Sequence, residues 1–141
     1  MISKFDGTVA QLFELQIRAL GKVYLAEKNL VWALKQKKTI ALQYKKNDEL
    51  VGVIIIVNKI FRPWSGLYFF VVDKKHHSIG VGSSLLSEAE KLCLRPKLRL
   101  FLRKNDMKAI GFFESKNYIL TKIKPKYYSS KLDALVYAKK L

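Results

Sequence analysis

Hydrophobic residues recur every three or four positions in the first part of the chain, which is the period of an amphipathic helix. This spacing predicts helices over residues 8–20 and 26–35. Thr8 and Gln11 have the side chains of a capping box at the start of the first helix, and Gly21 suits its end. We therefore expect two helices near the start of the chain.

From residue 39 the pattern changes to that of strands. Residues 39–46 and 50–61 flank a short polar turn and predict a hairpin, while residues 67–73 are apolar on both faces, as in a central strand. The other expected elements are a turn over 63–66, a helix over 80–94, a strand over 97–104, a helix from 105 or 106 to about 116, and strands over 118–123 and 133–141. This order predicts one α/β (α+β) domain over residues 1–141, with a mixed central sheet and helices on both faces.

The composition supports a folded domain. Half of the 141 residues are hydrophobic and 12% are aromatic, unlike a disordered chain. The single cysteine, Cys93, excludes an internal disulfide framework and fits a reducing compartment. The longest apolar run, which starts at Leu50, is far shorter than the roughly 20 residues that cross a bilayer. We expect a cytoplasmic protein without a membrane-spanning segment.

The formal net charge of +16 changes this picture, because such a field attracts anions. Nucleic acid, acidic proteins, phosphorylated cofactors and membrane surfaces are all candidates. The basic residues come in small groups along the sequence, and no single helix carries a basic stripe. Nucleic-acid binding is therefore possible but not favoured.

The stretch "HHSIGVGSSLL" holds the first candidate chemistry. Gly80 and Gly82 lie between a predicted strand and a predicted helix. The first amides of a helix lack internal partners, and glycine lets a ligand approach the backbone, so this turn can bind a pyrophosphate. It lacks the lysine of a Walker loop and the third glycine of a dinucleotide fingerprint. By itself the stretch fits an ordinary tight turn equally well.

Three segments resemble one family. "VDKKHHSIGVGSSLL", from Val72, resembles the acetyl-CoA-binding motif of the GCN5-related N-acetyltransferase (GNAT) superfamily, with His77 where that family prefers Arg or Gln. "NDMKAIGFFESKNY", from Asn105, resembles the family's later helix, with Asn117 in place of a glycine, and asparagine is the non-glycine residue best suited to a left-handed helix end. "YYSSKLDALVY", from Tyr127, is similar to the C-terminal segment of the N-terminal protein acetyltransferases, the ribosomal-protein-alanine and Ard-type branch, which implies a loop that helps hold the N-terminal residues of the substrate. The order of predicted elements matches this fold along nearly the whole chain.

The resemblance implies an acetyl-CoA-dependent N-acetyltransferase. We expect it to transfer an acetyl group to a primary amine, with a protein or peptide N-terminus favoured, by direct attack in a ternary complex. A lysine side chain or a small amine is an alternative acceptor. A catalytically weak module that binds nucleic acid or an acidic partner is the alternative outside enzymes. A monomer and a homodimer both remain open.

The resemblance also assigns residues. Backbone groups of the central strand would hold the pantetheine arm, and the glycine turn would bind the pyrophosphate. The start of the later helix would contact the amides of the pantetheine arm. Lys75 and Lys116 are the nearest lysines in sequence for the 3′-phosphate. The expected cofactor-binding residues are Phe70, Val71, Val72, His77, Ser78, Ile79, Gly80, Val81, Gly82, Asn105, Asp106 and Phe113.

The catalytic positions depart from the family pattern. Phe113 stands where the family has a tyrosine that protonates the thiolate, and Phe101 stands where the N-terminal branch has its base. Tyr68 is the first substitute, unless it is a core tyrosine with a satisfied hydroxyl. The next candidates are Tyr127 and Tyr128. His76 and His77 are expected beside the pyrophosphate rather than in catalysis, and no Cys/His/Asp cluster has the spacing of a metal site.

Overall fold

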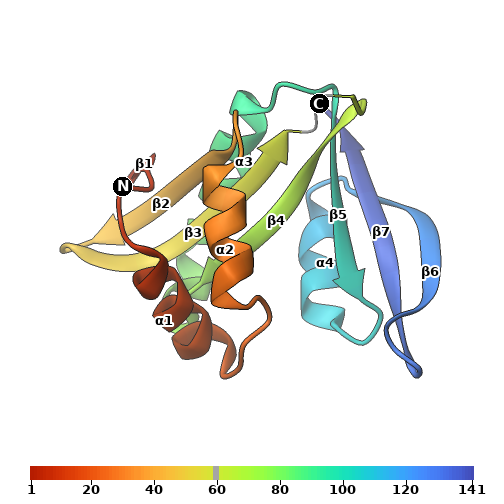
Figure 1. Ribbon diagram of the computed structural model, residues 1–141, viewed down its shortest axis with the longest axis horizontal. Coiled ribbons are helices and arrows are strands. Elements are labelled where there is room, and N and C mark those ends of the chain that lie inside the picture. The colour runs from red at the N-terminus through yellow and green to blue at the C-terminus, as the bar shows by residue number, and fades with distance from the viewer. Residues whose placement is uncertain (59–60) are drawn as a thin grey trace. The chain divides into compact units, whose positions relative to one another are not determined.

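A computed structural model of the chain describes residues 1–58 and 61–141, and it divides them into two compact units (Figure 1). The first unit comprises Met1–Asn58 and Tyr68–Leu94, and the second comprises Lys59–Leu67 and Arg95–Leu141. The strands follow the hydrogen-bonded order β1-β2-β3-β4-β5-β7-β6, and β4 (Trp64–Val72) contributes residues to both units. β4 pairs with β5 in parallel, whereas β2 and β3 pair antiparallel, which confirms the predicted mixed sheet.

The first unit has helices on both faces of its strands. Its elements are β1 (Ile2–Lys4), α1 (Val9–Leu20), α2 (Glu27–Lys35), β2 (Ile40–Lys46), β3 (Glu49–Asn58), the 3-10 helix η1 (Lys74–Ile79) and α3 (Val81–Leu92). The capping box of α1 is confirmed, because the Gln11 amide donates to Thr8 Oγ1 at 3.2 Å and the Thr8 amide donates to Gln11 Oε1 at 2.8 Å. Gly21 ends α1 with φ 73°, as predicted.

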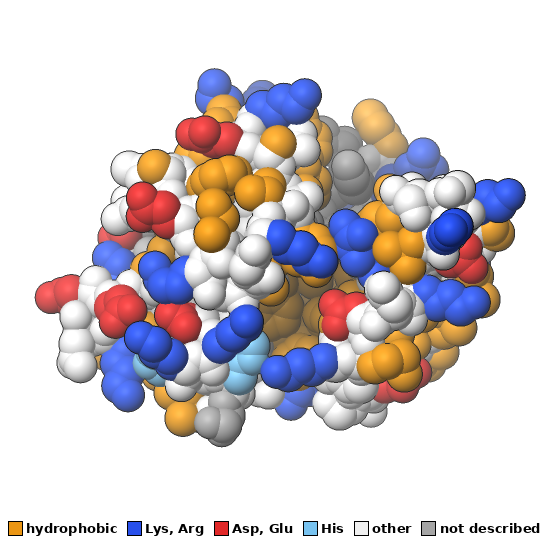
Figure 2. All heavy atoms as spheres, turned by 90° about the horizontal axis from the view of Figure 1, so that it is seen from below, with side chains coloured by type: hydrophobic (Ala, Val, Ile, Leu, Met, Phe, Trp, Pro, Cys, Tyr) orange, Lys and Arg blue, Asp and Glu red, His pale blue; other side chains and the backbone are white. Residues whose placement is uncertain are grey.

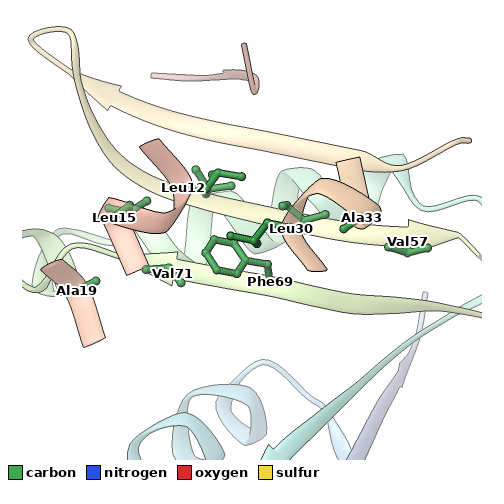
Figure 3. Close-up of a cluster of buried hydrophobic side chains, with 10 residues drawn as sticks. Leu12, Leu15, Ala19, Leu30, Ala33, Val57, Phe69 and Val71 are labelled. Carbon is green, nitrogen blue, oxygen red and sulfur yellow. The ribbon is translucent and has the colours of Figure 1, made fainter. Parts of the chain in front are cut away.

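Two hydrophobic layers explain this arrangement. Alternate residues of β3 point to opposite faces. Val53, Ile55 and Val57 pack against α1 and α2 in the cluster that Figure 3 shows. Ile54 and Ile56 are also fully buried and belong to the other face, where α3 lies (Figure 1). Each fully buried aliphatic side chain contributes about 1.5–3 kcal/mol, so both helical layers hold the strands of this unit.

The second unit is built on one helix. Its remaining elements are β5 (Lys97–Arg103), α4 (Met107–Ser115), β6 (Ile119–Ser129) and β7 (Leu132–Lys140). Asp106 is the cap of α4, since its Oδ1 accepts from the Ala109 amide at 3.1 Å. Asn117 follows the helix with φ 71°, so the predicted left-handed residue is confirmed. Tyr137 of β7 donates its hydroxyl hydrogen to Glu114 of α4 at 2.9 Å, which ties that helix to the strands.

Several boundaries predicted from the sequence are wrong. The expected turn over 63–66 is largely strand, because Trp64–Gly66 pair with Lys97–Arg99 of β5. Tyr127 and Tyr128 belong to β6 rather than to a loop. β1 and η1 were not predicted, and α3 ends at Leu92 rather than at residue 94. Residues 59–60 of the predicted strand 50–61 lie outside the described residues. No helix in the described ranges combines the length and the apolar character needed to span a membrane.

Candidate active site

Gly80 forms the turn between η1 and α3. Its φ of 81° lies in the left-handed region, and an added Cβ would meet no atom within 4 Å, so backbone conformation rather than crowding requires glycine here. The first helical bond of α3 runs from the Ser84 amide to the Gly80 carbonyl at 3.0 Å. Among the side chains that the structure describes, none caps the helix, so its first amides remain available to an anion. This geometry fits the pyrophosphate of acetyl-CoA.

Asp73 anchors the start of this turn and is only 3% exposed. Its carboxylate accepts from the Lys75 amide at 3.2 Å and from Arg18 Nε at 3.0 Å, while its own amide donates to the Val51 carbonyl at 2.8 Å. Burial raises the pKa of Asp73, but the hydrogen bonds from Lys75 and Arg18 and their charges outweigh it, so the net pKa is lowered. An ionised Asp73 therefore joins α1, β3 and η1. Nothing in the sequence marked this residue.

The end of β4 presents alternate backbone groups to its two edges. The Asp73 amide faces β3, so the backbone groups of Val71 face β3 as well, and those of Phe70 and Val72 point away from it. The ring of His77 reaches back to this second edge, with Nε2 at 2.6 Å from the Val72 carbonyl oxygen. Because a carbonyl only accepts, Nε2 carries the hydrogen. Of the three residues predicted to hold pantetheine through the backbone, Phe70 and Val72 have the suitable orientation.

The other predicted residues of the turn differ in exposure. Val81 is buried and Ile79 is 55% exposed. His76 Nδ1 is buried without a hydrogen-bond partner among the described residues. Lys75 is exposed on η1. The side chain of Ser78 lies outside the described part of the chain, so its predicted role concerns the backbone alone.

Tyr68, the first catalytic candidate, lies in β4 of the first unit. Its ring contacts Trp32 of α2 at a centroid distance of 5.4 Å and packs against the hydrophobic cluster. Its hydroxyl makes no hydrogen bond with any residue that the structure describes. Burial raises the pKa of Tyr68, so the hydroxyl stays protonated at neutral pH. Tyr68 is suited to donate a proton and poorly suited to act as a base.

Phe113 and Phe101 occupy different surroundings in the second unit. Phe113 is 5% exposed and makes edge-to-face contacts with Phe112 and Tyr118, so it belongs to the core beside α4. Phe101 contacts Tyr127 at a centroid distance of 5.2 Å. A direct contact of Phe113 with the cofactor, which the sequence predicted, stays a prediction.

Tyr127 and Tyr128 lie side by side on β6, with ring centroids 5.1 Å apart. Burial raises the pKa of Tyr128, Arg103 lowers it and Tyr127 raises it, and the net direction is upward. The structure therefore brings Phe101, Tyr127 and Tyr128 together. Asp106 is already engaged as the cap of α4, whereas Asn105 beside it is exposed.

Comparison with known proteins adds to this geometry. The sequence matches the Acetyltransferase (GNAT) family over residues 9–118. The chain belongs to this family. It is therefore a GNAT N-acetyltransferase whose cofactor is acetyl-CoA, as the motifs around Gly80 and Asn105 predicted. A comparison with curated protein sequences gives no match.

Solved structures share the fold of this GNAT chain. The ribosomal-protein-S18-alanine N-acetyltransferase of Escherichia coli is 22% identical, with a TM-score of 0.84 over 99% of this chain and 92% of that one. An aminoglycoside 6′-N-acetyltransferase in complex with coenzyme A is 18% identical, with a TM-score of 0.83 over 99% and 96%. Ard1 from Thermoplasma volcanium is 19% identical, with a TM-score of 0.81 over 100% and 97%. Their different acceptors leave the acceptor of this chain open.

Basic residues are widespread on the surface of the protein. Figure 2 shows Lys and Arg side chains dispersed over one face among hydrophobic and acidic ones, without a single basic patch. Their distribution along the chain is nevertheless uneven. The second unit holds 15 of the 27 Lys and Arg but only 3 of the 11 Asp and Glu, a formal balance of +12 out of +16.

Proposed function

We propose that this GNAT enzyme acetylates the α-amine at the N-terminus of a protein or peptide, by direct attack of the amine in a ternary complex. Acetyl-CoA supplies an activated acetyl thioester when bound. The first amides of α3, beginning at Val81 and Gly82, would bind its pyrophosphate, and the outward-facing backbone groups of Phe70 and the Val72 amide would bind the pantetheine arm, since the Val72 carbonyl already accepts from His77. The remaining residues of the turn, from His77 to Gly80, would surround the pyrophosphate, and Asn105 would reach the amides of the pantetheine arm.

The observation that carries the choice of acceptor is the chemistry of the expected base positions. Phe101 and Phe113 have no titratable group, and the pKa values of Tyr68 and Tyr128 are raised. A group whose pKa lies far above neutral is a weak base at pH 7. The acceptor must then supply its own neutral amine.

An α-amine meets this requirement far better than a lysine side chain. With unperturbed pKa values of about 7.7–8.0 and about 10.4, about one in ten α-amines but only about one in two thousand lysine amines is neutral at pH 7. The formal charge of +12 on the second unit also favours the neutral form of the acceptor amine, because nearby positive charge lowers the pKa of an amine. The same charge disfavours a polycationic acceptor such as an aminoglycoside.

Tyr68 then acts as a proton donor. Its side chain is partly buried and its hydroxyl is protonated, so it would donate a proton to the sulfur that the acetyl group leaves, and the proton that the attacking amine loses would restore the hydroxyl. The resemblance gives this role to the tyrosine that the family has at the position of Phe113. Tyr127 and Tyr128 contact the acceptor. Replacing Tyr68 with Phe should lower kcat while the thermal stabilisation by acetyl-CoA is unchanged. An unchanged kcat would remove Tyr68 from the mechanism.

Two peptides of the same sequence test the acceptor. The first has a free α-amine and no lysine, and the second has an acetylated N-terminus and one lysine in the middle. Mass spectrometry at pH 7 should show acetylation of the first at least about a hundredfold faster, as the neutral fractions require. Equal or faster acetylation of the lysine peptide would overturn the proposal. Thermal stabilisation by DNA, with none by acetyl-CoA, would instead favour a binding module.

A further inference from the structure

One face of the second unit combines cations with aromatic rings. Leu98, Leu100 and Leu102 of β5 are buried. The alternate residues of β5, Arg99 and Phe101 among them, point to the opposite face and remain partly exposed. We call this the cation–aromatic face, and its members are Trp64, Arg99, Phe101, Arg103, Lys124, Tyr127 and Tyr128.

The cations of this face rest on its rings. The Arg99 guanidinium lies 4.4 Å from the Trp64 ring centroid and 5.1 Å from that of Phe101. Lys124 Nζ lies 5.0 Å from the Phe101 ring centroid, and the Arg103 guanidinium 4.4 Å from that of Tyr128. Cation–π attraction of this kind holds long side chains in place, so their N–H groups are oriented before a ligand arrives.

The few carboxylates of the second unit are engaged elsewhere. Asp106 caps α4, and Glu114 accepts from Tyr137. Asp133 Oδ2 lies 3.8 Å from Lys104 Nζ, and Asp133 Oδ1 accepts a hydrogen bond from the Lys126 amide. Among the described residues, no carboxylate forms an ion pair with Arg99 or Lys124. A ligand is thus the natural source of negative charge for this face.

We propose that the cation–aromatic face binds acidic side chains close behind the N-terminus of the acceptor peptide. This inference rests on the proposed function and specifies its substrate class. Alternate residues of a strand are about 6.5–7 Å apart, so Arg99 and Arg103, which are four positions apart on β5, are about 13 Å apart, the spacing of every fourth residue in an extended peptide. Two acidic residues four positions apart in the acceptor match this spacing, each meeting oriented N–H donors.

Single-stranded nucleic acid fits the face less well. Bases bind such surfaces by stacking on open ring faces. Here Trp64, Phe101 and Tyr128 each have a cation over the ring, so stacking would require these contacts to be broken. A carboxylate instead approaches the N–H groups of the cation and leaves the cation–ring contact intact.

The test uses binding of fluorescent peptides measured by anisotropy, with acetyl-CoA absent. One peptide carries Asp at positions 2 and 6, and its matched peptide carries Asn there. We expect the Asp peptide to bind at least about tenfold more tightly, since hydrogen bonds to charged groups contribute about 1.5–3 kcal/mol. Replacing Arg99 or Lys124 with Met should reduce the difference to about twofold or less. Lys131→Met removes the same charge from the turn between β6 and β7 and should leave the difference intact.

Three results would overturn the inference: equal binding of the two peptides, an equal effect of Lys131→Met and Lys124→Met, or displacement of the Asp peptide by a lower concentration of oligo(U). Its failure can be told from that of the proposed function. Acetylation of peptide N-termini without a preference for Asp leaves the function standing and removes this inference. Tight binding of the Asp peptide that depends on Arg99, without acetyl transfer, would support this inference and contradict the proposed function.

Discussion

Asp73 offers the sharpest test of how the glycine turn is held. The change Asp73→Asn keeps the size of the side chain and removes its charge. The carboxylate accepts two hydrogen bonds, from the Lys75 amide and from Arg18, and it is almost fully buried. Hydrogen bonds to a charged group contribute about 1.5–3 kcal/mol and neutral ones about 0.5–1.5 kcal/mol. The Arg18 side chain is 42% exposed, so we discount its share. The expected loss is about 2 kcal/mol in the free energy of unfolding at pH 7.

The effect depends on pH in a defined direction. The pKa of Asp73 is lowered in the folded protein from its ordinary value of 3.8, so the unfolded chain takes up the proton first as the pH falls. The stabilisation is therefore complete well above pH 3.8 and is lost as the pH falls through the folded pKa. Urea unfolding followed by tryptophan fluorescence at pH 7, 5 and 3 should show the difference between wild type and Asp73→Asn shrinking at the lowest pH.

A matched variant separates this effect from a general change in charge. Asp48→Asn removes the same charge from the exposed turn between β2 and β3, and asparagine tolerates the φ of 63° found there. It should unfold like wild type at all three pH values. If Asp73→Asn loses less than about 0.5 kcal/mol at pH 7, or loses the same amount at pH 3, the account of Asp73 as a stabilising buried anion is wrong.

Three further changes test the surroundings. Gly80→Ala places an alanine in a left-handed conformation, so it should lower the free energy of unfolding by about 1 kcal/mol and weaken the thermal stabilisation by acetyl-CoA. Gly111→Ala is the matched control, because the space around Gly111 in α4 is equally open, and it should raise the free energy of unfolding by about 0.5–1 kcal/mol. Tyr137→Phe should cost about 1 kcal/mol. Because burial and a carboxylate raise the pKa of Tyr137 above 10.0, wild type but not this variant should lose stability from that hydroxyl as the pH rises beyond that value. His77→Ala should lower stability by about 0.5–1 kcal/mol by removing the donor to the Val72 carbonyl, and His77→Gln should recover part of it.

Local features of the structure could be predicted from the sequence. The capping box at Thr8, the left-handed residues Gly21 and Asn117, and the periods of the main helices depend on neighbours a few positions away. The glycine turn at Gly80 could be placed because a helix start needs a particular local conformation. These elements were sufficient for the fold class, since their order restricts the arrangement of the sheet.

Features that depend on distant partners could not be predicted. Trp64–Gly66 look like a turn until β5 supplies strand partners from more than thirty residues away. Tyr127 and Tyr128 look like a loop until β6 is seen to continue to Ser129. The role of Asp73 depends on Arg18, 55 residues earlier. Long-range pairing of this kind leaves no mark on the local pattern of hydrophobic residues.

Two consequences of the charge of the second unit can be measured in one assay. Positive charge near the acceptor lowers the pKa of the acceptor amine and attracts the acceptor carboxylates. Salt screens both effects, because the Debye length falls from about 10 Å at 0.1 M to about 3 Å at 1 M. Raising NaCl from about 0.05 to about 0.5 M should therefore raise KM several-fold for the Asp peptide but little for the Asn peptide. For both peptides it should move the pH of half-maximal kcat/KM upward, because screening restores the ordinary pKa of the amine. A midpoint that does not move would show that a protein group rather than the acceptor amine sets the pH dependence, and the choice of an α-amine would lose its main support.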